Sequence, residues 1–236
     1  MHLYLYGIGQ GVLHPITQGE WEVTDFVGLR GDKVYYISTE SSPLKRDLYR
    51  VGLDGKHKER LTPGDGYYSI YPSADLSYYI CEGGDSSAPG RTDVFNAAGK
   101  RVRTLYDNAP LKEALVEAGL PVREFFTFTT ERGDELNGYM LKPLDFDPAK
   151  RYPVLLTQYS GPGSQQVAEG WGPDWEDALV THGYIVVCVD PRGTGYRGEE
   201  FKKLTYGNLG RLEVEDQIST ARYMARQSYV DPARIG

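Results

Sequence analysis

The sequence predicts two kinds of fold in one chain of 236 residues, blades of a β-propeller first and then a sheet alternating with helices. Three observations carry this prediction. Short motifs recur at a fixed spacing in the first half of the chain. Apolar runs of strand length alternate with helical patterns in the second half. The pattern changes near Asp107, so we assign residues 1–109 to the C-terminal blades of a propeller and residues 110–236 to the second part.

The repeat in the first half relates residues that lie 45 positions apart. Each copy has an aromatic-rich segment, an apolar strand, a strand that leads to a glycine turn, and a closing strand. Four short strands in about 45 residues are typical of a propeller blade, and the fixed spacing favours blades over plain β-meanders. A weaker third copy is predicted around Gly99, Lys100 and Leu105. The matched residues are Leu3-Tyr4 with Leu48-Tyr49, Ile16-Thr17 with Leu61-Thr62, and Gly19 with Gly64.

The second part is expected to open with a helix and a hairpin. Apolar residues at helical spacing predict a helix over residues 109–118, and Gly119 is the expected stop signal. Alternating segments over residues 125–130 and 136–142 flank a turn that contains Gly133, which is the pattern of a β-hairpin.

Strand and helix patterns then alternate to the end of the chain. Two antiparallel strands followed by β-α-β-α-β is the order in which an α/β-hydrolase fold begins, so the sequence predicts the N-terminal part of such a domain. The expected elements are strands over residues 153–156, over 184–190 and from 234, a helix over 175–180 capped by Asp174, and a helix within 208–227.

The helix within residues 208–227 carries a set of apolar residues and a set of acidic residues near its start. Its apolar positions are at helical spacing. Acidic residues near its start are expected to be solvated and favoured by the helix dipole, in preference to forming a metal site. The apolar set is Val214, Ile218, Ala221 and Ala225, and the acidic set is Glu213, Glu215 and Asp216.

Composition excludes several classes of function. The net charge of -7 argues against a nucleic-acid surface, which needs clustered Lys and Arg. The apolar stretch over residues 184–189 is too short to span a bilayer, and the N-terminus lacks the features of a signal peptide. Cys81 and Cys188 each lie in an apolar strand pattern and are expected to be small buried residues, without a disulfide or a zinc site.

The sequence does not contain a complete catalytic triad. In an α/β-hydrolase the nucleophilic serine lies within Gly-x-Ser-x-Gly, and that motif does not occur here. Ser160 and Ser164 flank glycines but lack the context of such a turn. His182 is expected at a helix end, where a cation suits the dipole. Residues 192–195 (Arg-Gly-Thr-Gly) read as a structural turn, since they lack the full spacing of a phosphate loop.

Five segments together resemble a known family. Residues 159–165 (Tyr-Ser-Gly-Pro-Gly-Ser-Gln), 190–198 and 209–217 are similar to three segments of dipeptidyl peptidase IV-type serine peptidases, in the prolyl oligopeptidase superfamily. Residues 17–23 and 34–38 are similar to segments of the family's propeller. The residues of the segment at 159–165 most resemble those of the family's bacterial branch.

The resemblance implies an eight-bladed propeller joined to an α/β-hydrolase domain that uses a Ser–Asp–His triad. The substrate would be a peptide with a free N-terminus, from which a dipeptide with Pro or Ala second is released. One catalytic residue is carried over, Tyr159, whose hydroxyl would donate to the oxyanion. The nucleophile would follow Gly236, and the glutamates that bind the substrate amine would lie in an earlier propeller region. This fragment is therefore expected to be inactive alone.

The resemblance implies no cofactor and no metal, and it allows a homodimer of the full-length protein. Bacterial members of the family are generally exported, which favours an extracytoplasmic location. Two alternatives stay open from the sequence. One is a related prolyl tripeptidyl or acylaminoacyl peptidase, and the other is a non-catalytic propeller-hydrolase scaffold.

Overall fold

The structure is a computed structural model that describes residues 1–236, and the chain forms two compact units, described separately below. Two short segments from the second half of the chain belong to the first unit. Unit 1 comprises Met1–Pro110, Ala168–Trp171 and Tyr196–Glu199, and unit 2 comprises Leu111–Val167, Gly172–Gly195 and Glu200–Gly236.

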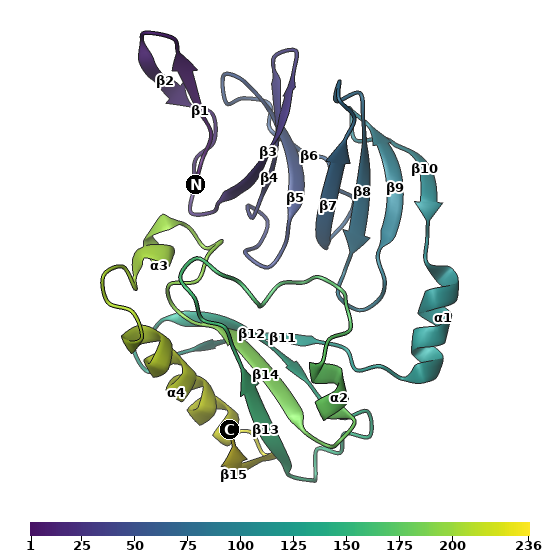
Figure 1. Cartoon of the computed structure of the whole chain (residues 1–236), viewed down its shortest axis with the longest axis vertical. Helices are drawn as coiled ribbons and strands as arrows, with labels where there is room; N and C mark the ends of the chain where they lie inside the picture. Colours follow the sequence, from purple (N-terminus) through teal and green to yellow (C-terminus); the bar gives the residue numbers. More distant parts are fainter. The chain divides into compact units, whose positions relative to one another are not determined.

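Unit 1 contains two four-stranded antiparallel sheets and a separate hairpin (Figure 1). In each sheet, strands that follow one another in the chain pair with one another, which is the meander of a propeller blade. The predicted blades are confirmed. The first blade is β3 (Val23–Arg30), β4 (Lys33–Ser38), β5 (Asp47–Gly52) and β6 (Glu59–Arg60). The second is β7 (Tyr67–Pro72), β8 (Tyr78–Gly84), β9 (Arg91–Asn96) and β10 (Arg101–Tyr106). The hairpin is β1 (Tyr4–Gly7) and β2 (Gly11–Pro15).

The weaker copy of the repeat predicted around Gly99 is confirmed, and it is part of the second blade. Gly99 and Lys100 form the turn between β9 and β10, and Leu105 lies within β10, so all three belong to the second blade. They correspond to the turn at Gly55 that precedes β6 in the first blade. The hairpin of β1 and β2 is a further, incomplete copy, since Leu3-Tyr4 at the start of β1 matches Leu48-Tyr49 in β5.

Aromatic residues fill the interior of both blades. The rings of Tyr79 and Phe95 stack with centroids 5.4 Å apart, and the rings of Tyr36 and Tyr49 stack at 5.7 Å. Each of these residues is at most 6% exposed. The hydroxyl of the buried Tyr79 donates to the carbonyl oxygen of Leu61 at 3.0 Å, so its polar end has a hydrogen-bond partner inside unit 1.

The two later segments of unit 1 pack on the first blade through the main chain and one ring. The hydroxyl of Thr39 donates to the carbonyl oxygen of Tyr196 at 3.0 Å, and the amide of Glu169 donates to the carbonyl oxygen of Leu44 at 2.9 Å. The guanidinium of Arg46 lies 3.9 Å from the centroid of the Tyr196 ring, a cation–π contact.

Unit 2 is built on a five-stranded sheet in the order β11-β12-β14-β13-β15. β13 pairs in parallel with β14 and β15, whereas β12 pairs antiparallel with β11 and β14. This is the strand order of the N-terminal part of an α/β-hydrolase, so this half of the predicted fold is confirmed as well. The strands are β11 (Glu124–Thr129), β12 (Glu135–Leu141), β13 (Tyr152–Thr157), β14 (Ile185–Asp190) and β15 (Val230–Ile235).

The helices are short except for one. None of them is both long and apolar enough to cross a membrane. The chain forms α1 (Ala109–Ala118), α2 (Glu176–Val180), α3 (Glu199–Lys203) and α4 (Arg211–Ala225).

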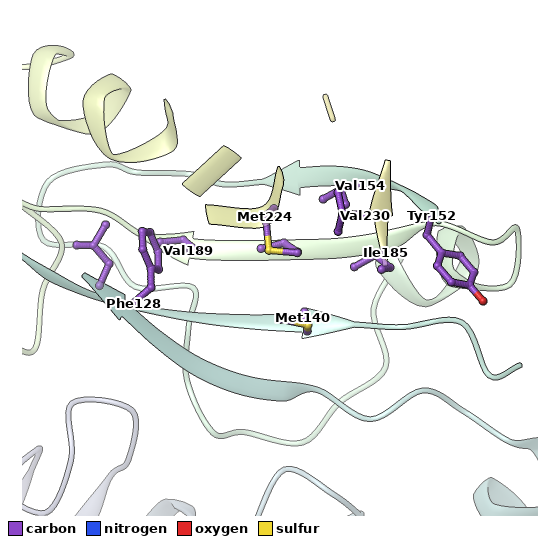
Figure 2. Close-up of a cluster of buried hydrophobic side chains, with 10 residues drawn as sticks. Phe128, Met140, Tyr152, Val154, Ile185, Val189, Met224 and Val230 are labelled. Carbon is purple, nitrogen blue, oxygen red and sulfur yellow. The ribbon is translucent and has the colours of Figure 1, made fainter. Parts of the chain in front are cut away.

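The core of unit 2 lies between its sheet and α4 (Figure 2). All six residues of β14 are buried, as the apolar run over residues 185–189 predicts for a central strand. From the helix, Met224 is fully buried among Ile185, Val187 and Val230. Cys188 is also buried and carries a free thiol, as Cys81 does in unit 1.

The structure departs from the sequence pattern at two helices. The face of α4 that carries Val214 and Ile218 is not its buried face, since these side chains are 58% and 47% exposed. The buried positions are mostly polar, and their hydrogen bonds explain why they are inside. The predicted cap of α2 at Asp174 is wrong, because Trp175 takes the cap position; the carboxylate of Asp174 accepts a hydrogen bond from the amide of Trp175 at 2.7 Å. The buried residues of α4 are Asp216, Ser219, Thr220 and Met224.

Candidate active-site loop

Tyr159 lies two residues after the C-terminal end of β13 and exposes 71% of its surface. The next residue, Ser160, has φ +57°, a left-handed conformation that costs a residue other than glycine about 1 kcal/mol. The ring of Tyr159 lies against the main chain at Gly161, where an added Cβ would be 2.4 Å from ring atom Cε1. Glycine therefore allows the ring to rest on its own loop.

The loop after β13 is joined to the loop after β14 by main-chain hydrogen bonds. The amide of Gly163 donates to the carbonyl oxygen of Gly193, and the amide of Gly195 donates to that of Ser164, both at 2.9 Å. A Cβ on Gly195 would lie 2.6 Å from the carbonyl oxygen of Gly163, so the two chains can approach this closely only because Gly195 has no side chain.

Asp190, the last residue of β14, adds a second connection between the two loops. Its carboxylate accepts hydrogen bonds from the amides of Gln166 at 3.0 Å and Val167 at 2.9 Å. Asp190 is 7% exposed, and hydrogen bonds from main-chain amides are what make such a buried carboxylate tolerable.

Arg192, two residues further on, carries a buried ion pair with Asp216 of α4. Nε and Nη2 of Arg192 donate to the Asp216 carboxylate at 3.0 and 2.7 Å, and the main-chain amide of Arg192 donates to it at 2.7 Å. Nη1 donates to Asp134 in the β11–β12 turn at 2.9 Å. Hydrogen bonding to Asp216 is the main cause that raises the pKa of Arg192. Asp216 is fully buried, so the prediction that it is solvated is wrong.

The base of the loop is held from the other side by Glu176 of α2. The hydroxyl of Thr157, the last residue of β13, donates to Oε1 of Glu176 at 2.7 Å, and the hydroxyl of the buried Tyr139 donates to Oε2 at 2.7 Å. Burial raises the pKa of Tyr139, and it raises the pKa of the neighbouring Cys188 thiol to about 12. These groups are therefore neutral hydrogen-bonding or packing groups at neutral pH.

The other candidate residues have structural partners. Ser164 donates its hydroxyl to the carbonyl oxygen of Gly161 at 2.5 Å, and Ser160 is bonded to the side chain of Gln158. Nδ1 of His182 lies 2.8 Å from the carbonyl oxygen of Ala178 at the end of α2, the helix-end position that the sequence predicts.

The acidic residues at the start of α4 have separate partners. Glu213 accepts from the amide of Gly210 at 2.9 Å, as in a capping box, and Glu215 lies 3.0 Å from Arg132. Sequence reasoning missed the roles of Arg192 and Asp216. The available signal was an arginine two residues after a buried strand together with an acidic residue on a later helix.

Two family models match the chain. The model described as "Dipeptidyl peptidase IV (DPP IV) N-terminal region" matches residues 1–89, and the model described as "Prolyl oligopeptidase family" matches residues 171–236. The chain belongs to the prolyl oligopeptidase family of serine peptidases. Within this family, the chain is of the dipeptidyl peptidase IV type, as the relatives below indicate.

Solved structures and curated sequences agree with this assignment. The crystal structure of Porphyromonas gingivalis dipeptidyl peptidase 4 is similar over 100% of this chain and 34% of its own, with a TM-score of 0.93 and 42% identity, which is consistent with the bacterial branch. A probable dipeptidyl peptidase 4 of Emericella nidulans is 37% identical over 99% of this chain and 31% of its own length. A probable dipeptidyl-aminopeptidase B of Aspergillus niger is 39% identical over 93% and 25%. The chain thus spans about a third or less of these relatives.

Proposed function

We propose that the chain contributes the oxyanion-stabilising loop of a dipeptidyl exopeptidase, with Tyr159 as the hydrogen-bond donor. The substrate is a peptide with a free N-terminus and Pro or Ala in its second position. The observation that carries the proposal is the position of Tyr159. Its side chain is exposed at the carboxyl end of a central parallel strand, where α/β enzymes place their reacting groups, and its loop is fixed at several points.

The chemistry asked of Tyr159 is electrostatic. When a nucleophile attacks the scissile carbonyl, negative charge develops on the carbonyl oxygen, and a fixed O–H donor stabilises that charge without having to reorganise. Loss of one such donor costs about 3–4 kcal/mol of transition-state stabilisation. The loop supports this role, since Ser160 is held in a left-handed conformation and Gly163 is bonded to the neighbouring loop.

The experiment is a Tyr159→Phe substitution in the full-length protein that carries this chain, assayed with Gly-Pro-p-nitroanilide. We expect kcat to fall by about 10² to 10³-fold with little change in KM, because the hydrogen bond forms mainly in the transition state. Tyr206→Phe is the matched control, since Tyr206 is 87% exposed in the same unit and lies outside the loop. An unchanged kcat for Tyr159→Phe would remove this residue from the mechanism.

Substrate length separates the proposed exopeptidase from its relatives. We expect Gly-Pro-p-nitroanilide to be cleaved faster than tripeptidyl and N-acetylated substrates, because the proposed reaction needs a free amine two residues from the scissile bond. Faster cleavage of an Ala-Ala-Pro or an acetyl-alanyl substrate would favour a tripeptidyl or acylaminoacyl peptidase, and no turnover of any substrate would favour a scaffold. We further propose that residues 1–236 alone have no activity, since no residue described above supplies a nucleophile paired with a histidine.

A further inference from the structure

We propose that Arg192 is a positioning residue for Tyr159. The guanidinium does not reach the tyrosine. It is held by Asp216 and fixes the loop after β14, and that loop fixes the loop of Tyr159 through contacts of the main chain. The positional part of this inference concerns the chain alone, whereas its consequence for turnover rests on the proposed function.

The first step is the anchoring of Arg192. Its side chain is 7% exposed and is bonded to two elements: to α4 through Asp216 and, at 3.5 Å, Glu215, and to the β11–β12 turn through Asp134. The main-chain amide of Arg192 also donates to Asp216. A guanidinium in this fork geometry has one well-defined orientation, so the main chain at residue 192 is fixed relative to α4.

The second step links the loop after β14, which Arg192 fixes, to the loop after β13, which contains Tyr159. Gly193 follows Arg192 directly, and its carbonyl oxygen accepts the hydrogen bond from the Gly163 amide. An added Cβ on Gly193 would lie 2.4 Å from Oγ1 of Thr205, so this residue is closely packed. Gly195 then donates to Ser164 and touches Gly163.

The third step concerns the start of the Tyr159 loop. The side-chain amide of Gln217, the residue after Asp216 on α4, donates to the carbonyl oxygen of Val189 at 3.3 Å and to Oγ of Ser160 at 3.5 Å. α4 therefore contacts the Tyr159 loop directly at Ser160 and indirectly through Arg192. If the ion pair is lost, the weak hydrogen bonds of Gln217 are the remaining connection from α4 to the Tyr159 loop. We therefore expect the tyrosine ring to become more mobile.

The experiment follows the Tyr159 ring itself. The chain is prepared with 3-fluorotyrosine at position 159 only, and its ¹⁹F resonance is recorded for the parent and for three variants. Asp216→Asn removes the charge of the pair. Gly195→Ala separates the loops and leaves the pair intact, because Gly195 is not in a left-handed conformation and only the close contact opposes a side chain. Ser219→Ala is the control, a buried change on α4 that does not touch Arg192.

We expect Asp216→Asn and Gly195→Ala each to shift the resonance or to change its line width at least twofold, and Ser219→Ala to leave it unchanged. An unchanged resonance in a folded Asp216→Asn variant would overturn the inference. If Asp216→Asn does not fold, Gly195→Ala decides, and an unchanged resonance there would overturn the inference as well.

Kinetics in the full-length protein then separate the inference from the proposed function. We expect Gly195→Ala to lower kcat at least tenfold with less than a threefold change in KM, and to lower it much less when Tyr159 is already Phe. A shifted resonance with an unchanged kcat would support the positional inference and refute the role of Tyr159 in turnover. A lower kcat with an unchanged resonance would refute positioning by Arg192 and leave the proposed function standing.

Discussion

Removal of the Asp216 carboxylate offers a direct measure of how strongly the buried ion pair stabilises unit 2. Asp216→Ala deletes the acceptor of three hydrogen bonds from Arg192, at 2.7, 3.0 and 2.7 Å, and leaves a guanidinium that is 7% exposed. Breaking a buried pair by removing one partner costs about 3–5 kcal/mol. Asp134 and Glu215 remain near Arg192 and are partly exposed, so we expect a loss near the lower end, about 3 kcal/mol.

The assay is urea unfolding, with amide hydrogen exchange in β14 as the readout. This readout reports on unit 2 alone. With a slope of about 1.5 kcal/mol per molar urea, a loss of 3 kcal/mol lowers the midpoint by about 2 M. Arg132→Ala is the control, because Arg132 is 55% exposed in its pair with Glu215, and such a pair contributes less than about 1 kcal/mol. A midpoint shift below about 0.5 M for Asp216→Ala would refute the reasoning that this pair is a principal support of the loop.

The other predictions concern buried groups outside the Arg192–Asp216 pair. Burial raises the pKa values of the Cys81 and Cys188 thiols to about 12, whereas an unfolded thiol titrates near 9. The stability that comes from keeping them neutral is complete below about pH 9 and is lost between pH 9 and 12, by up to about 1.4 kcal/mol per thiol per pH unit. Urea midpoints at pH 8 and 10.5 test this, and modification of either thiol in the folded chain at pH 8 would contradict it. Tyr139→Phe should cost about 2 kcal/mol by removing a donor from the buried Glu176 carboxylate, with Tyr206→Phe as the unchanged control in the same thermal unfolding experiment.

The sequence predicted the elements well where the signal is local. The 45-residue repeat predicted both blades, and the apolar run over residues 185–189 identified β14 as a central strand, because burial on both faces favours apolar residues throughout. The weaker match was confirmed as well, and its place follows from the spacing, since 44 or 45 residues relate each part of one blade to the same part of the next. Matches at Gly99 and Leu105 therefore belonged to the second half of a blade already counted.

The candidate site was less predictable because its contacts are distant in the chain. Val214 and Ile218 are at helical spacing yet exposed, and the buried face of α4 is decided by Asp216, whose partner Arg192 lies 24 residues earlier. No periodicity in the helix contains that information. The prediction of Tyr159 as a catalytic residue rests on the family resemblance. The chain contains 19 tyrosines, and nothing in the spacing of Tyr159 distinguishes it from the others. Its assigned role stays a prediction.

The contact between Gly163 and Gly195 consists of main-chain atoms only, and this has a consequence for protein engineering. A contact of this kind is insensitive to the chemistry of nearby side chains but highly sensitive to the number of residues between its fixed points. Libraries that vary exposed side chains of the two loops should therefore retain the loop geometry. A single insertion or deletion between β13 and Gly163 should abolish it, even where the inserted residue is small.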